Sequence, residues 1–183
     1  MIGTTMHAMI EVELTGEYQP MPTETSILTS ALRGIAVFGQ WKQDKTINCI
    51  AHEKRMVSPT LKIGGTYDLL CQIDDGPVIL VDFKSSSAIR AKHIAQVAAY
   101  VDMVNEVEDR TIDTACILRF GRDGTSEELW VDGEILDRGR HMFLLAYQMF
   151  QLSKELCIDA KSGTHLVNRV VKTQPIAFMG TTY

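Results

Sequence analysis

Residues 64–84, GGTYDLLCQIDDGPVILVDFK, contain two apolar runs separated by a turn. Asp74, Asp75 and Gly76 are residue types that hairpin turns use, so residues 64–73 and 77–84 are predicted to be paired strands. The second run is almost continuously apolar, as expected of a buried central strand. A hairpin centred near residue 75 places residue 68 opposite about residue 82. The stretch therefore predicts a buried sheet that carries Asp68 and Asp82 side by side.

Helices and further strands are predicted on either side of this hairpin. Apolar spacing predicts helices over residues 4–15, 24–41, 89–106 and 134–157 and strands over 46–57, 112–120 and 126–131. Residues 16–23 form a predicted loop, and the apolar residues at 142–150 are expected in the core. The order α-α-β-β-β-α-β-β-α indicates an α/β fold with a central mixed sheet flanked by helices. We expect one domain over residues 1–157 and a tail or arm over residues 158–183.

The composition is that of an ordinary globular protein, with 45% hydrophobic and 22% charged residues in a chain of 183. No apolar run is long enough for a membrane span and no leader peptide is recognisable, so we expect a cytoplasmic protein without a membrane partner. The cysteines form no CxxC pair, which disfavours a zinc or iron–sulfur site. The net charge of -5 counts mildly against a nucleic-acid binder, although many basic residues fall between positions 42 and 93, around the two aspartates.

The residues at the end of the central strand have a pattern that points to metal chemistry. Asp82 and Lys84 are two apart in a strand and therefore share a face. Adjacent carboxylates repel each other unless a cation lies between them, and a hard divalent ion with oxygen ligands, Mg²⁺ or Mn²⁺, fits best. Such an ion can bind a phosphoryl oxygen and lower the pKa of a bound water, while a lysine orients that water. The carbonyl of Phe83 is a further candidate ligand.

Asp68 followed by Asp82-Phe83-Lys84 resembles the active-site pattern of the PD-(D/E)xK nuclease superfamily, which has a restriction-endonuclease-like core. Three further motifs resemble the RecB-like exonuclease branch of that superfamily. They are the G-x-x-D of Gly65 to Asp68, the Q-x-x-x-Y of Gln96 and Tyr100, and the G-x-x-x-H of Gly3 to His7 at the first predicted helix. The resemblance covers residues 3 to about 105 in the expected order. Tyr67 stands where proline is common in this branch.

This resemblance implies roles for particular residues. The catalytic residues would be Asp68, Asp82 and Lys84, and the metal ligands His7, Asp68, Asp82 and the carbonyl of Phe83. Gln96 and Tyr100, four residues apart on one helix face, would contact DNA or brace the site. Glu11 is a candidate support for His7, and Glu53 is an auxiliary candidate on a neighbouring strand.

The function that the resemblance implies is a Mg²⁺- or Mn²⁺-dependent DNA exonuclease of phage or bacterial recombination or repair. The candidate partners are DNA and a recombination or replication protein, in the host cytoplasm if the chain is phage-encoded. Two alternatives remain open at this point. One is a structure-specific endonuclease, because the same metal chemistry serves both activities, and the other is a catalytically silent DNA-binding subunit.

Overall fold

A computed structural model describes residues 2–16, 24–108, 110–121 and 124–162. Two helices, α1 (Ile2–Thr15) and α2 (Thr25–Lys42), precede the strands β1 (Ile47–Ser58), β2 (Ile63–Ile73) and β3 (Val78–Lys84). Helix α3 (Ala91–Val107) leads to β4 (Ala115–Phe120) and β5 (Ser126–Val131), and α4 (Gly133–Ser162) follows. The strands form one five-stranded sheet in the order β1-β2-β3-β4-β5, in which only the β3–β4 pair is parallel. The predicted element order and the mixed sheet are confirmed.

The hairpin of β2 and β3 has the register that its turn residues predict. Backbone pairs run from Gln72 and Val78 at the turn to Leu69 and Val81, so each pair is centred on residue 75. Asp74 and Asp75 both have positive φ angles, of 48° and 58°, which is the left-handed conformation that aspartate tolerates in tight turns. Asp68 precedes Leu69 in β2 and is the next residue beyond the last backbone pair of the hairpin. It therefore lies close to the end of β3.

An irregularity in β1 changes which of its residues lies opposite Asp68 of β2. Cys49 pairs with Cys71, but Ala51 pairs with Leu70, so Ile50 is an additional residue in β1. Such a β-bulge exchanges the two faces of the strand beyond it. Without the bulge, His52 would lie opposite Asp68; with it, Glu53 takes that place.

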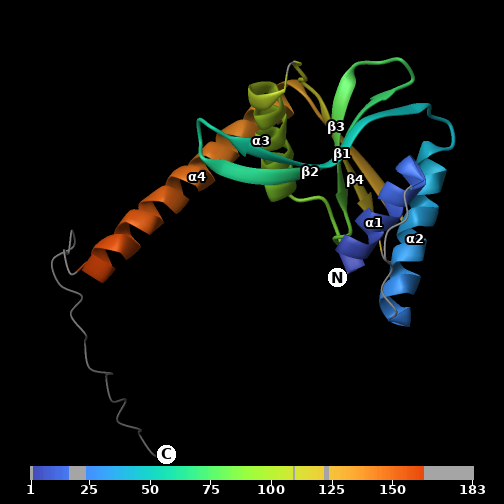
Figure 1. Ribbon diagram of the computed structural model, residues 1–183, viewed down its shortest axis with the longest axis horizontal. Helices are drawn as coiled ribbons and strands as arrows, with labels where there is room; N and C mark the ends of the chain where they lie inside the picture. The colour runs from blue at the N-terminus through green and yellow to red at the C-terminus, as the bar shows by residue number, and fades with distance from the viewer. Residues whose placement is uncertain (1, 17–23, 109, 122–123, 163–183) are drawn as a thin grey trace, which may run out of the picture. The chain divides into compact units, whose positions relative to one another are not determined.

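Helices α1 and α2 cover one face of the sheet and α3 covers the other (Figure 1). Each face has its own apolar cluster. On one face, Met6 and Ile10 of α1 and Phe38 of α2 pack against side chains of β2, β3 and β4. On the other face, Val97 and Val101 of α3 pack against a second set of strand side chains. A helix that crosses between the parallel strands β3 and β4 must cover one face of the sheet, as α3 does. The loop from β3 into α3 therefore begins directly after Lys84, at the end of the strand that carries Asp82.

The strand predicted over residues 112–120 begins three residues later, at Ala115. The reason is a side chain in α3. Asn105 accepts a hydrogen bond from the Ile112 amide and donates one to the Ile112 carbonyl, both at 2.7 Å. These two bonds satisfy the backbone of Ile112, which consequently needs no partner strand.

The prediction that residues 142–150 are buried in the core is wrong. Met142, Leu144, Leu145, Met149 and Phe150 of α4 are all exposed, whereas Leu136 near its start is buried. Periodicity in a sequence shows that a helix has an apolar face but not that anything covers it. The helix also continues to Ser162, beyond its predicted end at residue 157, because no glycine or proline occurs between residues 140 and 162.

The chain divides into two units, Met1–Leu144 and Leu145–Tyr183. The second unit is described only as the helical residues 145–162. Most of the predicted loop at 16–23 and the predicted tail beyond residue 162 lie outside the described residues. Within the described ranges, no helix has the length and apolar character needed to cross a membrane.

Candidate active site

Three carboxylates lie in a row across β1, β2 and β3. In the β1–β2 register, the pairs on either side of Glu53 and Asp68 are matched, so these two residues lie opposite each other. The last backbone pair between β2 and β3 is that of Leu69 and Val81, and Asp68 and Asp82 are the next residues beyond it on the two strands. The hairpin therefore places the two predicted aspartates side by side, as the sequence indicated.

Asp68 links the middle of β2 to the end of β3 through its side chain. Its Oδ2 accepts a hydrogen bond of 2.6 Å from the backbone amide of Phe83. This carboxylate thus satisfies a backbone donor beyond the last backbone pair of the hairpin, and only 9% of Asp68 is exposed. The second oxygen, Oδ1, lies 3.4 Å from Nδ1 of His7 on α1. One oxygen of Asp68 therefore fixes the strand end while the other faces the neighbouring helix.

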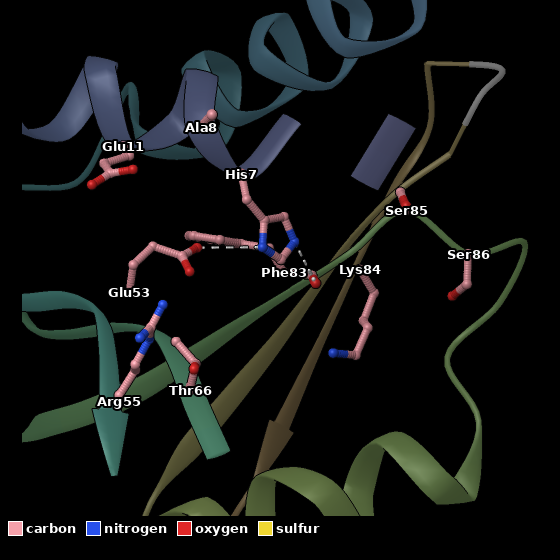
Figure 2. Close-up of a pocket in the computed structure, with 10 residues that line it drawn as sticks. All are labelled: His7, Ala8, Glu11, Glu53, Arg55, Thr66, Phe83, Lys84, Ser85 and Ser86. Carbon is pink, nitrogen blue, oxygen red and sulfur yellow. Dashed lines mark hydrogen bonds and ion pairs between the residues drawn. The ribbon is translucent and has the colours of Figure 1, made fainter. Parts of the chain in front are cut away.

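His7 points from α1 toward the ends of the central strands (Figure 2). Its Nε2 lies 3.1 Å from the carbonyl oxygen of Phe83, and its Nδ1 lies 3.5 Å from Oε1 of Glu53 as well as near Asp68. Burial lowers the pKa of His7, but the carboxylates of Asp68 and Glu53 outweigh it and raise this pKa to about 10. The imidazole therefore lies in a strongly negative environment that favours a cation at this position.

Asp82 and Lys84 form an ion pair at the end of β3. Nζ of Lys84 lies 2.6 Å from Oδ2 of Asp82, and only 1% of Asp82 is exposed. Burial raises the pKa of Asp82, the charge of Asp68 raises it further, and the ammonium of Lys84 opposes both. Lys84 thus partly compensates a buried pair of negative charges.

The residues that converge here fit a divalent metal ion. Ligand atoms of His7, Glu53 and Asp68 all lie within 4.8 Å of one another. Carboxylate oxygens are the ligands that Mg²⁺ and Mn²⁺ prefer, and one imidazole is compatible with Mn²⁺. The predicted ligand set of His7, Asp68, Asp82 and the Phe83 carbonyl differs from this group. The Phe83 carbonyl lies next to Nε2 of His7. Asp82, which was predicted as a ligand, is paired with Lys84, and Glu53 occupies the position beside His7 and Asp68.

Glu53 has a backbone conformation that supports a functional role. Its φ angle of 42° lies in the left-handed region, which is uncommon for a residue in a strand. The bulge at Ile50 and this strained residue together bring the carboxylate toward His7. Neither feature has a signal in the sequence, which explains why Glu53 was predicted only as an auxiliary residue.

Glu11 does not support His7 as the sequence suggested. Its Oε1 lies 3.1 Å from Nδ1 of His52, which the bulge turns away from Asp68. The partners of His7 among the described residues are Asp68, Glu53 and the carbonyl of Phe83. Glu11 instead joins α1 to β1 at the edge of the same cleft.

A cleft of about 720 Å³ opens over this group. Figure 2 shows side chains from α1, β1, β2 and the end of β3 around it. Five of the residues that line the cleft were not among the predicted site residues, namely Ala8, Arg55, Thr66, Ser85 and Ser86. The strand alternation could have indicated Arg55 and Thr66, because each lies two residues from a carboxylate.

No family model and no curated protein matches this chain. A solved structure does. The crystal structure described as "Putative exonuclease" from Eubacterium rectale matches 95% of this chain and 77% of its own, with a TM-score of 0.52 and 10% sequence identity. The two chains share a fold. The alkaline exonuclease LHK-Exo from Laribacter hongkongensis is also similar, with 10% identity over 87% of this chain and 84% of its own and a TM-score of 0.41.

Gln96 and Tyr100 of α3 lie beside the strands that carry the site. Nε2 of Gln96 donates a hydrogen bond of 3.0 Å to the hydroxyl of Tyr100, and the tyrosine ring packs on Gly65 of β2. Both side chains are half-buried, and neither belongs to the residues that line the cleft. Of the two predicted roles, bracing of the site fits this placement better than contact with DNA.

The loop that follows Lys84 is held by a buried arginine of β4. Arg119 lies opposite Lys84 in the parallel register, and its Nη1 donates a hydrogen bond of 3.3 Å to the carbonyl of Ser86. The same guanidinium binds Glu127 at 2.8 Å and Thr125 at 3.2 Å. Arg119 is only 5% exposed, and these bonds tie the backbone at Ser86, in the wall of the cleft, to β4 and to the residues before and in β5.

Proposed function

We propose that this protein is a metal-dependent DNA nuclease of the PD-(D/E)xK type, RecB-like branch, which hydrolyses phosphodiester bonds from DNA ends. The observation that carries the proposal is the convergence of His7, Glu53 and Asp68 beside the Asp82–Lys84 pair. Two of these carboxylates, Asp68 and Asp82, are buried, and buried negative charges side by side are unfavourable unless cations compensate them. Their retention at the floor of an open cleft is explained by binding of a metal and a polyanionic substrate.

The metal in this proposal is Mg²⁺ or Mn²⁺, held by His7, Asp68 and Glu53, with Asp82 and the Phe83 carbonyl beside them. When bound, such an ion supplies a Lewis acid for the phosphoryl oxygen and a more acidic water. The chain contributes fixed geometry. The Asp68 carboxylate is held by the Phe83 amide, so the ligands are positioned before the substrate arrives.

Lys84 has the position required to act on the attacking water. Its ammonium is fixed 2.6 Å from the Asp82 carboxylate and lines the cleft. An ammonium group there can orient a water by hydrogen bonding and offset the negative charge that develops on the phosphoryl group. The charges of Asp82 and Lys84 compensate each other, and the end of β3 holds both side chains in position.

The choice of an exonuclease rests on the shared fold with the Eubacterium rectale structure and on the motif resemblance. The structure-specific endonuclease remains an outcome of the test below. A catalytically silent DNA-binding subunit would have no need of the pairing between Lys84 and a buried aspartate. We further propose a cytoplasmic location and a role in recombination or repair, with a recombination or replication protein as partner.

Cleavage of end-labelled linear DNA and of covalently closed circular DNA tests this proposal directly. Each substrate is incubated with the full chain in Mg²⁺, in Mn²⁺ or in EDTA. Lys84→Ala is the variant that should abolish activity, and Arg138→Ala is its control, since Arg138 also carries a positive charge but lies exposed on α4.

Degradation of linear DNA alone, lost in EDTA and in Lys84→Ala but retained in Arg138→Ala, is the expected result. Cutting of closed circles shows an endonuclease instead. DNA binding without cleavage in either metal leaves the silent subunit. Cleavage that persists in Lys84→Ala contradicts the proposed site, whichever substrate is cut.

A further inference from the structure

A second row of side chains lies next to the three carboxylates. Arg55 is two residues from Glu53 on β1, and Thr66 is two residues from Asp68 on β2. Arg55 and Thr66 are direct partners in the β1–β2 register. Lys84 stands in the same relation to Asp82 on β3, because alternate residues of a strand share a face. An acidic row is thus followed by a row of cation, hydroxyl and cation.

All three members of this second row face the cleft. Arg55, Thr66 and Lys84 are among its lining residues, and Figure 2 shows their side chains pointing into the same space as His7 and Glu53. Lys84 is paired with Asp82, but Arg55 forms no ion pair with any side chain in the described ranges. The guanidinium of Arg55 and the hydroxyl of Thr66 both face the cleft. Their hydrogen-bond donors are available for a ligand there.

The chemistry of these donors selects an anion with several oxygen atoms. Arginine presents planar, forked N–H groups that match phosphate oxygens, and a threonine hydroxyl is a frequent contact to the DNA backbone. The neighbouring acidic row repels an anion on its own, so a phosphate must straddle the cation and the metal site. A phosphodiester does this when one oxygen faces each row.

We propose that Arg55 and Thr66 form a binding site for a backbone phosphate of the DNA substrate, adjacent to the metal site. This inference rests on the nuclease function proposed above and assigns residues that hold the substrate in it. Arg55 supplies the charge and the forked donors, and Thr66 supplies one hydroxyl. The two residues position the strand so that a phosphoryl group lies over the carboxylate row.

A structural role for Arg55 is the competing explanation. On that view the guanidinium only neutralises Glu53 and keeps it in place for the metal. The two explanations differ in what Arg55→Ala changes, since loss of a substrate contact weakens DNA binding and leaves metal binding intact. Loss of a support for Glu53 weakens metal binding first.

The test measures DNA affinity and metal affinity on the same variants. Fluorescence anisotropy of a short labelled duplex and of a labelled single strand is recorded in Ca²⁺ and in EDTA, over a range of salt. The variants are Arg55→Ala, Arg55→Lys and Thr66→Val. The matched control is Lys54→Ala, which removes the same charge from the next residue, where the side chain pairs with Glu108 instead of facing the cleft.

Arg55→Ala is expected to weaken DNA binding by about 10-fold to 100-fold, the effect of losing hydrogen bonds to a charged group. The slope of log K against log salt should fall by about 1, because one phosphate contact is lost. Arg55→Lys should recover part of the affinity, and Thr66→Val should show a smaller loss. Lys54→Ala should bind as the wild type does.

Binding of Mn²⁺, followed by electron paramagnetic resonance without DNA, should be unchanged in Arg55→Ala. If Mn²⁺ binding is lost instead, Arg55 supports the metal ligands and the phosphate site is overturned. Wild-type DNA affinity and an unchanged salt slope in Arg55→Ala also overturn it, even if the wild type proves to be a nuclease. Conversely, weak binding by Arg55→Ala in a chain that cleaves no DNA keeps the phosphate site and removes the nuclease proposal.

Discussion

The aromatic ring of Tyr100 lies so close to the backbone of Gly65 that a Cβ atom on residue 65 would come within 2.6 Å of Cε1 of the tyrosine. Gly65 begins the G-x-x-D motif on β2, and Tyr100 ends the Q-x-x-x-Y motif on α3. The two motifs are therefore joined by a single packing contact. The contact sets the distance between α3 and the strand that carries Asp68, and it explains why a glycine is needed at position 65.

Gly65→Ala is expected to displace the tyrosine ring or the strand. The added methyl group overpacks the contact, which typically costs about 1–3 kcal/mol of unfolding free energy. Because Asp68 lies three residues away on the same strand, activity should fall more than stability alone explains. Urea unfolding and DNA cleavage measured on the same preparation check both effects.

The neighbouring glycine provides the control for this substitution. A Cβ on Gly64 would meet its nearest atom at 3.5 Å, an ordinary contact, so Gly64→Ala should leave both quantities near the wild-type value. If Tyr100→Leu, which removes the hydroxyl and the ring edge, restores stability to Gly65→Ala, the coupling between the two residues is demonstrated. Equal effects of the two alanine substitutions would contradict it.

Lys84→Ala is predicted to have a pH-dependent effect on stability in addition to the loss of activity. Without the ammonium, the buried Asp82 carboxylate has no cation beside it, and the pKa of Asp82 rises further above its ordinary value. The variant should therefore be destabilised by about 1–3 kcal/mol where Asp82 must ionise, and by less at acid pH, where Asp82 holds a proton. Cleavage should fall by about 10²-fold to 10⁴-fold, the range for loss of a group that acts on the attacking water.

Guanidinium unfolding of the metal-free protein across acid and alkaline buffers measures this dependence. Asp82→Asn combined with Lys84→Ala removes both charges and is expected to flatten it. A destabilisation of Lys84→Ala that is the same at every pH would show that lost packing, rather than the uncompensated buried charge of Asp82, is responsible.

His7 makes the stability of the metal-free wild-type protein depend on pH above neutrality. Its pKa is raised from 6.5 to about 10 by the carboxylates that outweigh burial. A raised folded-state pKa stabilises the fold fully below pH 6.5, and this contribution is lost as the pH rises toward 10. The free energy of unfolding should therefore decline over this interval in the wild type and decline less in His7→Ala.

Metal binding should reverse that behaviour, because a ligating imidazole must lose its proton. Titration calorimetry of Mn²⁺ in buffers of different ionisation enthalpy should detect release of close to one proton at mildly alkaline pH. His7→Ala should bind Mn²⁺ more weakly and release less. Proton release that is unchanged in His7→Ala would exclude His7 as the source.

The sequence predicted where Asp68 and Asp82 lie because their placement depends on local geometry. A turn of two aspartates and a glycine fixes the register of the hairpin, and that register alone brings Asp68 beside Asp82. Glu53 could not be placed in this way. Its position depends on the additional residue at Ile50, and a bulge has no composition that distinguishes it from regular strand.

Burial was the other property that local patterns could not supply. Arg119 appears in an apolar strand as an isolated charge, yet it is 5% exposed because Glu127, Thr125 and Ser86 satisfy it. In α4 the opposite case occurs, because apolar side chains that were predicted to be buried are exposed. An apolar stripe indicates which side chains share a face, but only the tertiary structure shows whether another element covers them.

Two leucines of α4 allow the difference between a covered and an uncovered apolar side chain to be measured with the same substitution at two positions. Leu136 is 2% exposed, in the apolar cluster that α3 covers, whereas Leu152 is 59% exposed. Alanine favours helix at both positions, so helix propensity does not separate them. Leu136→Ala should lower the free energy of unfolding by about 2–5 kcal/mol because it leaves a cavity. Leu152→Ala should change it by less than about 0.5 kcal/mol, as is usual for an exposed side chain.

Urea unfolding at several protein concentrations checks both values. The pair is informative because the residue type, the replacement and the helix are the same, and only the surroundings differ. A large loss for Leu152→Ala that shrinks as the protein is diluted would show that this side chain is buried between chains in solution. A large loss that is independent of concentration would place it against another part of its own chain, and either result would contradict the exposure found for Leu152.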